Sequence, residues 1–100
     1  MEPVTVYTTG PSCVKCTMTK RMLDGAGIPF VEVNVRENPA AYAYITEELG
    51  YSMAPVVVVD EQDHWCDVRP DQIDRIAERA ILHQMQREWG GRERLIHSNS

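Results

Sequence analysis

Two cysteines near the N-terminus point most directly to chemistry. Cys13 and Cys16 are separated by two residues and follow an apolar stretch, Val4–Thr8, and a Gly10-Pro11 break. Residues three apart lie on one face of a helix, so the two sulfurs are close enough to form a disulfide. The thiolate is the nucleophile of thiol–disulfide exchange, and C-x-x-C cysteines at helix N-termini have pKa values of about 7 or below, against about 8.5 for a free thiol. The pair is therefore a candidate redox switch.

The predicted helix gives the two thiols different environments. Cys13 begins the helix, where unpaired N–H groups and the helix dipole favour negative charge, and Lys15 adds a positive charge nearby. Cys16 falls on the apolar stripe of the helix and is expected to be the less accessible thiol. We expect the Cys13 thiolate to attack a substrate disulfide, after which Cys16 attacks Cys13 and releases the reduced substrate.

Other interpretations of the pair stay open. A C-x-x-C pair is half of many zinc sites, and His64 with Cys66 would complete a Cys₃His set. A zinc or iron–sulfur module using Cys13, Cys16 and Cys66 is the alternative from another class, and plain burial of both thiols is the third. Structural zinc sites usually offer two ligand pairs on loops, whereas this pair heads an amphipathic helix. The sequence context thus favours redox chemistry.

The elements that must position the cysteines alternate in type. The order β-α-β-α-β-β-α is typical of an α/β protein whose four-stranded mixed sheet has helices on both faces. A C-x-x-C motif beside a βαβ pattern indicates a thioredoxin fold. Strands are predicted over residues 4–8, 29–35, 56–59 and 64–68, and helices over residues 13–26, 39–49 and 70–89.

Local signals support these helices. Gly27 is a plausible residue after the end of the first helix, and Asn38-Pro39 is typical of a helix start. The predicted inner stripe of the first helix is Cys16, Thr19, Leu23 and Ala26, with Met22 beside it, and that of the last is Ile73, Ile76, Ala77, Ala80, Ile81 and Met85.

Pro55 stands immediately before the predicted strand at residues 56–59. Proline is tolerated at the first residue of a strand, and an X-Pro bond adopts the cis form at a cost of about 0.5 to 1 kcal/mol. We hypothesise that Ala54–Pro55 is cis and turns the Met53-Ala54 backbone toward the cysteines, where it can pair with an extended substrate segment. A trans proline that merely starts the strand is the alternative.

The chain resembles the glutaredoxin-like proteins of the thioredoxin superfamily, and within them the NrdH-redoxins of bacteria and phages, over about residues 4–80. This resemblance implies a thioredoxin fold with cis Pro55, Cys13 as the attacking thiol and Cys16 as the resolving thiol. It also implies that electrons come from thioredoxin reductase rather than glutathione and pass to class Ib ribonucleotide reductase. A glutathione-dependent glutaredoxin is the close alternative. The matching segments are Val4-Thr-Val-Tyr-Thr, Cys13-Val-Lys-Cys, Leu49-Gly-Tyr, Ala54-Pro-Val-Val-Val, His64-Trp and Arg69-Pro.

Two departures from the family pattern bear on function. The family usually shows W-S-G-F-R-P after the hairpin, whereas this chain has Cys66 and Asp67 at the Ser and Gly positions. The substitution at the Gly position calls into question a backbone conformation with φ above zero. Many glutaredoxins also carry a lysine, before the first cysteine, that holds a glutathione carboxylate; Thr9 stands in that loop here and favours a glutathione-independent redoxin.

Five residues are candidates for contact with substrate or partner. They are Met53, Ala54, Pro55, Trp65 and Arg69. For Trp65, packing in the core is the favoured alternative, because a tryptophan in a small domain is usually a large packing residue. Cys66 is expected to be a half-buried small hydrophobic residue.

Length and composition limit the remaining possibilities. One hundred residues fit one domain, predicted over residues 1–89 with a tail at 90–100, and we expect a monomer. The net charge of −5 argues against a nucleic-acid partner. The N-terminus shows no signal peptide, and the longest apolar run, residues 53–59, is too short to cross a membrane. We therefore expect a cytoplasmic protein that uses its disulfide without a metal or another cofactor.

Overall fold

The central sheet has four strands and is mixed, as predicted for a thioredoxin fold. The computed structural model describes residues 2–82. The strands are arranged β2-β1-β3-β4, with β1 parallel to β2, β1 antiparallel to β3, and β3 antiparallel to β4. Their bounds are Val4–Thr8 (β1), Phe30–Asn34 (β2), Val56–Asp60 (β3) and Asp63–Cys66 (β4).

The first helix, α1 (Val14–Gly25), begins and ends as the sequence predicts, within one residue. Cys13 is its N-cap residue rather than its first helical residue. Gly27 follows the end of the helix with a φ of 73°, a left-handed conformation that glycine adopts without steric cost. The two cysteines are therefore located at the start of α1, directly after the loop that follows β1.

The second helical segment departs from the prediction in its second half. Asn38 caps α2 (Pro39–Ala43) by accepting a hydrogen bond from the Ala41 N–H, as the Asn-Pro pair indicates. The chain then continues as a π-helical segment, η1 (Tyr44–Glu48), in which the Leu49 N–H bonds to the Tyr44 carbonyl five residues earlier. The start signal at Asn38-Pro39 and the predicted end at residue 49 indicate a single helix here, but such end signals do not distinguish this wider turn from an α-helical one.

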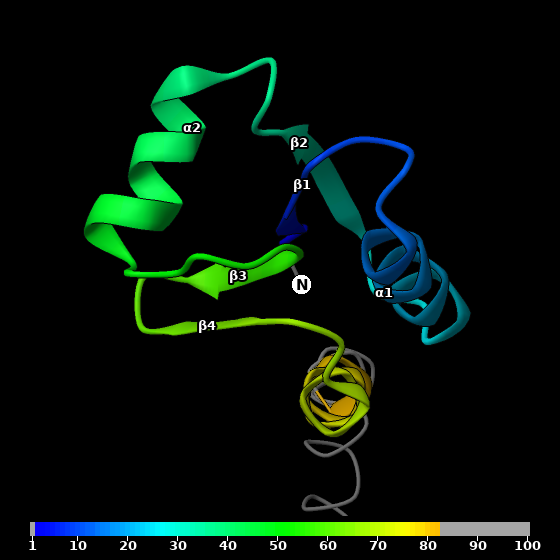
Figure 1. Cartoon of the computed structure of the whole chain (residues 1–100). Coiled ribbons are helices and arrows are strands. Elements are labelled where there is room, and N and C mark those ends of the chain that lie inside the picture. The colour runs from blue at the N-terminus through cyan, green and yellow to red at the C-terminus, as the bar shows by residue number, and fades with distance from the viewer. Residues whose placement is uncertain (1, 83–100) are drawn as a thin grey trace, which may run out of the picture.

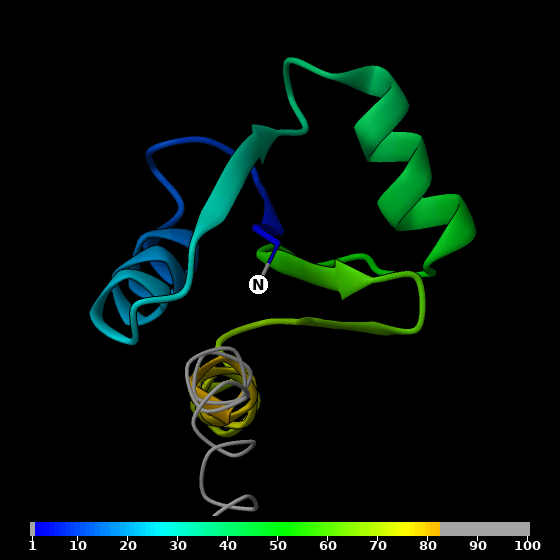
Figure 2. The ribbon, with the colours of Figure 1, turned by 180° about the vertical axis from the view of Figure 1, so that it is seen from behind.

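The helices cover both faces of the sheet (Figures 1 and 2). Leu23 of α1 and Ile73 and Ile76 of the last helix, residues 70–82 as far as the structure describes it, pack on one face with Val57 and Trp65. Ile45, with Leu49 and Tyr51, packs on the other face against Val35 and Val56. The expected α/β fold with helices on both faces is confirmed.

One predicted boundary and one predicted buried residue are wrong for physical reasons. The fourth strand ends at Cys66 instead of residue 68, because Asp67 has a φ of 72° and leaves the extended conformation. Ile81, predicted on the buried stripe, is 56% exposed. Ile81 follows Ile73 by eight residues, which at about 100° per residue turns its side chain roughly 80° from that of Ile73, to the edge of the buried stripe.

The rest of that helix's stripe, Met85, and the predicted end of the helix lie outside the described residues, as does the predicted tail at residues 90–100. Within residues 2–82, no helix combines the length and apolarity needed to cross a membrane.

Candidate redox site

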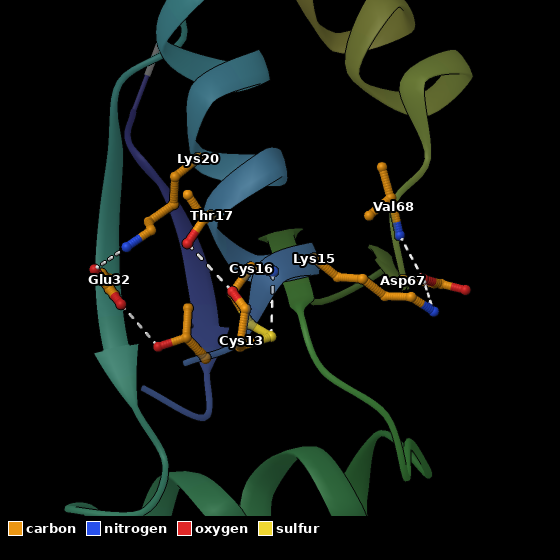
Figure 3. Close-up of a disulfide and its surroundings, with 9 residues drawn as sticks. Cys13, Lys15, Cys16, Thr17, Lys20, Glu32, Asp67 and Val68 are labelled. Atoms are coloured by element: carbon orange, nitrogen blue, oxygen red, sulfur yellow. Dashed lines mark hydrogen bonds and ion pairs between the residues drawn. A yellow bond between two sulfur atoms is a disulfide. The ribbon is translucent and has the colours of Figure 1, made fainter. Parts of the chain in front are cut away.

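Cys13 and Cys16 form a disulfide at the start of α1 (Figure 3). The Cys16 N–H donates a hydrogen bond to the Cys13 sulfur over 3.2 Å, so this sulfur is the side-chain cap of the helix. The Thr17 hydroxyl donates to the Cys13 carbonyl over 3.2 Å. The first turn of the helix therefore directs an N–H group at the position where a Cys13 thiolate carries its charge.

The two cysteines differ in accessibility as the helix register predicts. Cys16 is only 1% exposed, whereas Cys13 is half-buried. Thr19 and Leu23 continue the buried side of α1 beyond Cys16. The arrangement leaves Cys13 as the thiol that another molecule can reach.

The segment before β3 meets the residues that follow β4. The Ala54–Pro55 bond is cis, as hypothesised. The Asp67 N–H donates to the Pro55 carbonyl over 2.9 Å. Pro55 is buried and Ala54 half-buried, while Met53 is 46% exposed.

A lysine between the two cysteines pairs with this second segment. The Lys15 ammonium lies 3.0 Å from a carboxylate oxygen of Asp67. The Val68 N–H donates to the same carboxylate oxygen over 2.8 Å. This backbone hydrogen bond, followed by the one from Lys15, lowers the pKa of Asp67 below its usual value, so the carboxylate is charged at neutral pH.

A second charged group lies on the β2 side of the site. The Glu32 carboxylate accepts hydrogen bonds from the Lys20 ammonium over 2.9 Å and from the Thr8 hydroxyl over 2.8 Å. The bond from Lys20, and then that from Thr8, lowers the pKa of Glu32. Thr8 is fully buried at the end of β1, so this network fixes the start of the loop that leads to Cys13.

The two remaining predicted contact residues lie in contrasting environments. Trp65 is 4% exposed and belongs to the core beneath α1, as the packing interpretation predicts. Arg69 is 46% exposed and forms an ion pair with Asp71 over 3.0 Å. Of these two, only Arg69 offers a side chain to solvent.

Cys66 packs against the opposite face of the sheet from α1. It lies with Tyr51 and Val56, whereas its neighbour Trp65 faces α1, because successive strand residues point to opposite faces. As expected, Cys66 is half-buried. Nearby, the Tyr51 hydroxyl and His64 Nδ1 are 2.7 Å apart. Over residues 2–82, no three His, Cys, Asp or Glu side chains are grouped so that they could hold a metal ion.

The sequence did not predict the two ion pairs that flank the disulfide. For the pair on the β2 side, the sequence contains one local indication. Glu32 is the one charged residue in the strand Phe30–Asn34. Asp67 was singled out only as a departure at a glycine position, and nothing local connects it with Lys15. Both pairs join segments that are distant in the sequence, so they follow from the tertiary arrangement.

A thioredoxin fold with a C-x-x-C disulfide at the N-terminus of its first helix defines a thiol–disulfide oxidoreductase. Comparison with known proteins specifies the family: the glutaredoxin family model matches residues 4–65, and the chain belongs to this family.

Individual relatives agree with this assignment. The gene 56 protein of Mycobacterium phage L5 is 43% identical over 74 residues, covering 74% of this chain and 71% of that protein. The glutaredoxin-like protein NrdH of Escherichia coli K12 is 34% identical over 73 residues, covering 73% and 86%. The solved structure of E. coli NrdH-redoxin superposes with a TM-score of 0.66 at 35% identity, covering 74% of this chain and 93% of that one.

Proposed function

We propose that this protein reduces protein disulfides in the cytoplasm with electrons supplied by thioredoxin reductase, and that a class Ib ribonucleotide reductase is among the proteins it serves. In this proposal Cys13 is the attacking thiol and Cys16 the resolving thiol. The capping N–H of Cys16 and the greater accessibility of Cys13 support this division of roles.

The exchange proceeds in two balanced steps. The Cys13 thiolate attacks one sulfur of the substrate disulfide, a new S–S bond forms, and the other substrate sulfur leaves as a thiolate that takes up a proton. Cys16 then loses its proton and attacks the Cys13 sulfur, which releases the second substrate thiolate. The substrate gains two electrons, and the oxidised pair returns to the dithiol by the reverse exchange with the reductase.

One observation favours thioredoxin reductase over glutathione: the cations beside the site are already paired with carboxylates. Lys15 pairs with Asp67, Lys20 with Glu32 and Arg69 with Asp71. Glutathione carries two carboxylates, and cationic side chains are the strongest partners for such groups. Binding glutathione through any of these cations would therefore require breaking an existing ion pair.

The similarity to E. coli NrdH-redoxin, described as a glutaredoxin-like protein with a thioredoxin-like activity profile, also supports this choice of electron source. The ribonucleotide reductase assignment comes from the resemblance to NrdH-redoxins.

We further propose that an extended partner segment binds beside Cys13 along Met53, Ala54 and Pro55, with Arg69 at its edge. Met53 is the exposed apolar side chain of this group, and Arg69 is its exposed cation. Trp65 supports this surface from the core rather than contacting the partner.

A coupled assay tests the electron source. Reduction of DTNB or insulin is measured with NADPH and bacterial thioredoxin reductase, and in parallel with glutathione, glutathione reductase and NADPH. We expect turnover with thioredoxin reductase and little with glutathione. A thioredoxin control shows that the reductase is active, and the Cys13→Ser variant sets the background. Turnover with glutathione alone would overturn the proposal.

A second assay addresses the proposed target. Stimulation of a class Ib ribonucleotide reductase is measured with the same reductase and NADPH, in the presence of wild-type protein or the Cys16→Ser variant. Stimulation by the wild type alone is the expected result, and its absence with an active enzyme would contradict the target assignment.

A further inference from the structure

The cation closest in sequence to the attacking thiol is held away from it. Lys15 lies between the two cysteines, and its side chain extends toward Asp67 rather than toward the Cys13 sulfur (Figure 3). The side chains of Lys15 and Asp67 are 52% and 38% exposed, so the pair lies at the surface of the protein. An ammonium fixed in this way stabilises the thiolate less than one that is free to approach the sulfur.

The backbone around Asp67 fixes the position of its carboxylate. Its φ of 72° places the residue in the left-handed region, which aspartate and asparagine enter more readily than most residues. Its N–H bonds to the Pro55 carbonyl, and its carboxylate accepts the Val68 N–H. The carboxylate is therefore placed by the fold and does not depend on Lys15 for its orientation.

The other charged groups around the disulfide are engaged elsewhere. From α1 and β2, Lys20 and Glu32 pair with each other, and from the residues after β4, Arg69 pairs with Asp71. Tyr7 on β1, whose pKa is raised by burial and then by Tyr44, stays neutral, and both Tyr7 and Cys66 pack in the cluster on the α2 side of the sheet. Lys15 and Asp67 thus form the ion pair whose presence or absence can change the electrostatic environment of Cys13.

We propose that Asp67 is a positioning residue for thiol–disulfide exchange, which holds the Lys15 ammonium at the loop after β4 and thereby makes the dithiol more strongly reducing. The proposal rests on Cys13 being the attacking thiol, and it does not depend on which reductase recharges the protein.

The direction of each effect follows from electrostatics. Asp67→Asn removes the negative charge that holds Lys15 at the loop after β4 and releases the ammonium to approach the Cys13 sulfur, so the Cys13 thiolate is stabilised. A stabilised thiolate favours the reduced form, so the variant becomes the more oxidising protein. Lys15→Gln has the opposite effect, because it leaves the Asp67 carboxylate without its partner.

The test measures the rate of iodoacetamide alkylation of Cys13 against pH, together with the equilibrium with dithiothreitol, in reduced protein that carries Cys66→Ser. The variants are Asp67→Asn, Lys15→Gln and the combination of the two. We expect the alkylation midpoint to fall by about 0.5 to 1 pH unit in Asp67→Asn, and by a clearly smaller amount when Asp67→Asn is introduced into the Lys15→Gln protein. We also expect an increase of up to about tenfold in the equilibrium constant for reduction of the Asp67→Asn disulfide.

Asparagine at this position keeps the backbone conformation and can still accept the Val68 N–H, so only the charge is lost. The Asp67→Gly protein also tolerates the left-handed backbone and serves as the matched control. It should show the same alkylation midpoint as Asp67→Asn. An unchanged midpoint in Asp67→Asn, an equal shift with and without Lys15, or a shift in Asp67→Gly alone would each overturn the proposal.

Discussion

At the scale of single residues, Cys13 combines two structural tasks. Its sulfur caps α1 by accepting the Cys16 N–H, and the same sulfur is bonded to Cys16 in the disulfide. The cap also places an N–H donor at the sulfur that must carry negative charge when the disulfide is reduced. Because serine is a favourable N-cap residue, replacing Cys13 with serine removes the nucleophile and preserves the cap.

The first prediction concerns the division of roles within the pair. The Cys16→Ser protein should accumulate a mixed disulfide with thionitrobenzoate through Cys13, because the resolving thiol is absent. The Cys13→Ser protein should accumulate far less, because Cys16 is 1% exposed. Mass spectrometry of the trapped species, with Cys66→Ser as the background, identifies the modified residue. Trapping on Cys16 at a comparable rate would reverse the assigned roles.

At the scale of elements, the sequence predicts each segment better than it predicts the junctions between segments. Asn38-Pro39 and Gly27 specify helix ends through local backbone chemistry, and both predictions are confirmed. The left-handed Asp67 ends β4 early, although the residue type that most favours this conformation, glycine, is absent. Such a conformation is imposed by contacts with a distant segment, here the Pro55 carbonyl.

The site shows the same division between local and distant information. The burial of Cys16 follows from the helical period, and the cis Ala54–Pro55 bond was a hypothesis that the structure confirms. The ion pair between Lys15 and Asp67 joins residues 52 positions apart. The pair forms only when the folded sheet brings the segment after β4 close to α1. No local sequence pattern encodes this arrangement.

Glu32 links β2 to Lys20 of α1, and the pH dependence of this link can be predicted. The lowered pKa of Glu32 means that its interactions with Lys20 and Thr8 stabilise the fold above its ordinary pKa of 4.5, and that this stabilisation is lost as the pH falls through the lower folded-state value. The Glu32 side chain is 37% exposed, so screening limits the contribution to roughly 0.5 kcal/mol. Glu32→Gln should lower the free energy of unfolding by about this amount at pH 7 and by much less near pH 3.

Urea denaturation at the two pH values measures this effect. Glu37→Gln, at an exposed position outside the network, is the matched control and should change stability little at either pH. An equal loss for Glu32→Gln at pH 7 and at pH 3 would contradict the electrostatic explanation.

At the scale of the whole molecule, the sheet separates two clusters of buried side chains. The cluster beneath α1 and the last helix contains Leu23, Ile76, Val57 and Trp65, and the cluster beneath α2 and η1 contains Ile45 and Val56. The helical stripes predict Leu23 and Ile76 as members of the first cluster, because side-chain direction follows backbone period. The predicted stripe of the last helix is wrong at Ile81, which is exposed.

The stability of the fold should therefore depend on Leu23 and hardly at all on Ile81. Leu23 is fully buried, and Leu23→Ala should lower the free energy of unfolding by about 2 to 5 kcal/mol through lost burial and the cavity left behind. Ile81→Ala should change it by less than about 0.5 kcal/mol. Thermal and urea denaturation of the oxidised proteins provide the comparison. Similar losses in both variants would mean that Ile81 is part of the core.

The position of Cys66 on the far face of the sheet bears on how many electrons and how many free thiols the protein carries. Cys13 and Cys16 are bonded to each other, whereas Cys66 packs with Tyr51 and Val56 and is a free thiol. With this pairing, the Cys13–Cys16 couple carries two electrons when it is reduced and none when it is oxidised. A count of free thiols in the oxidised protein should therefore give one per molecule, which is the Cys66 thiol and not a residue of the redox pair.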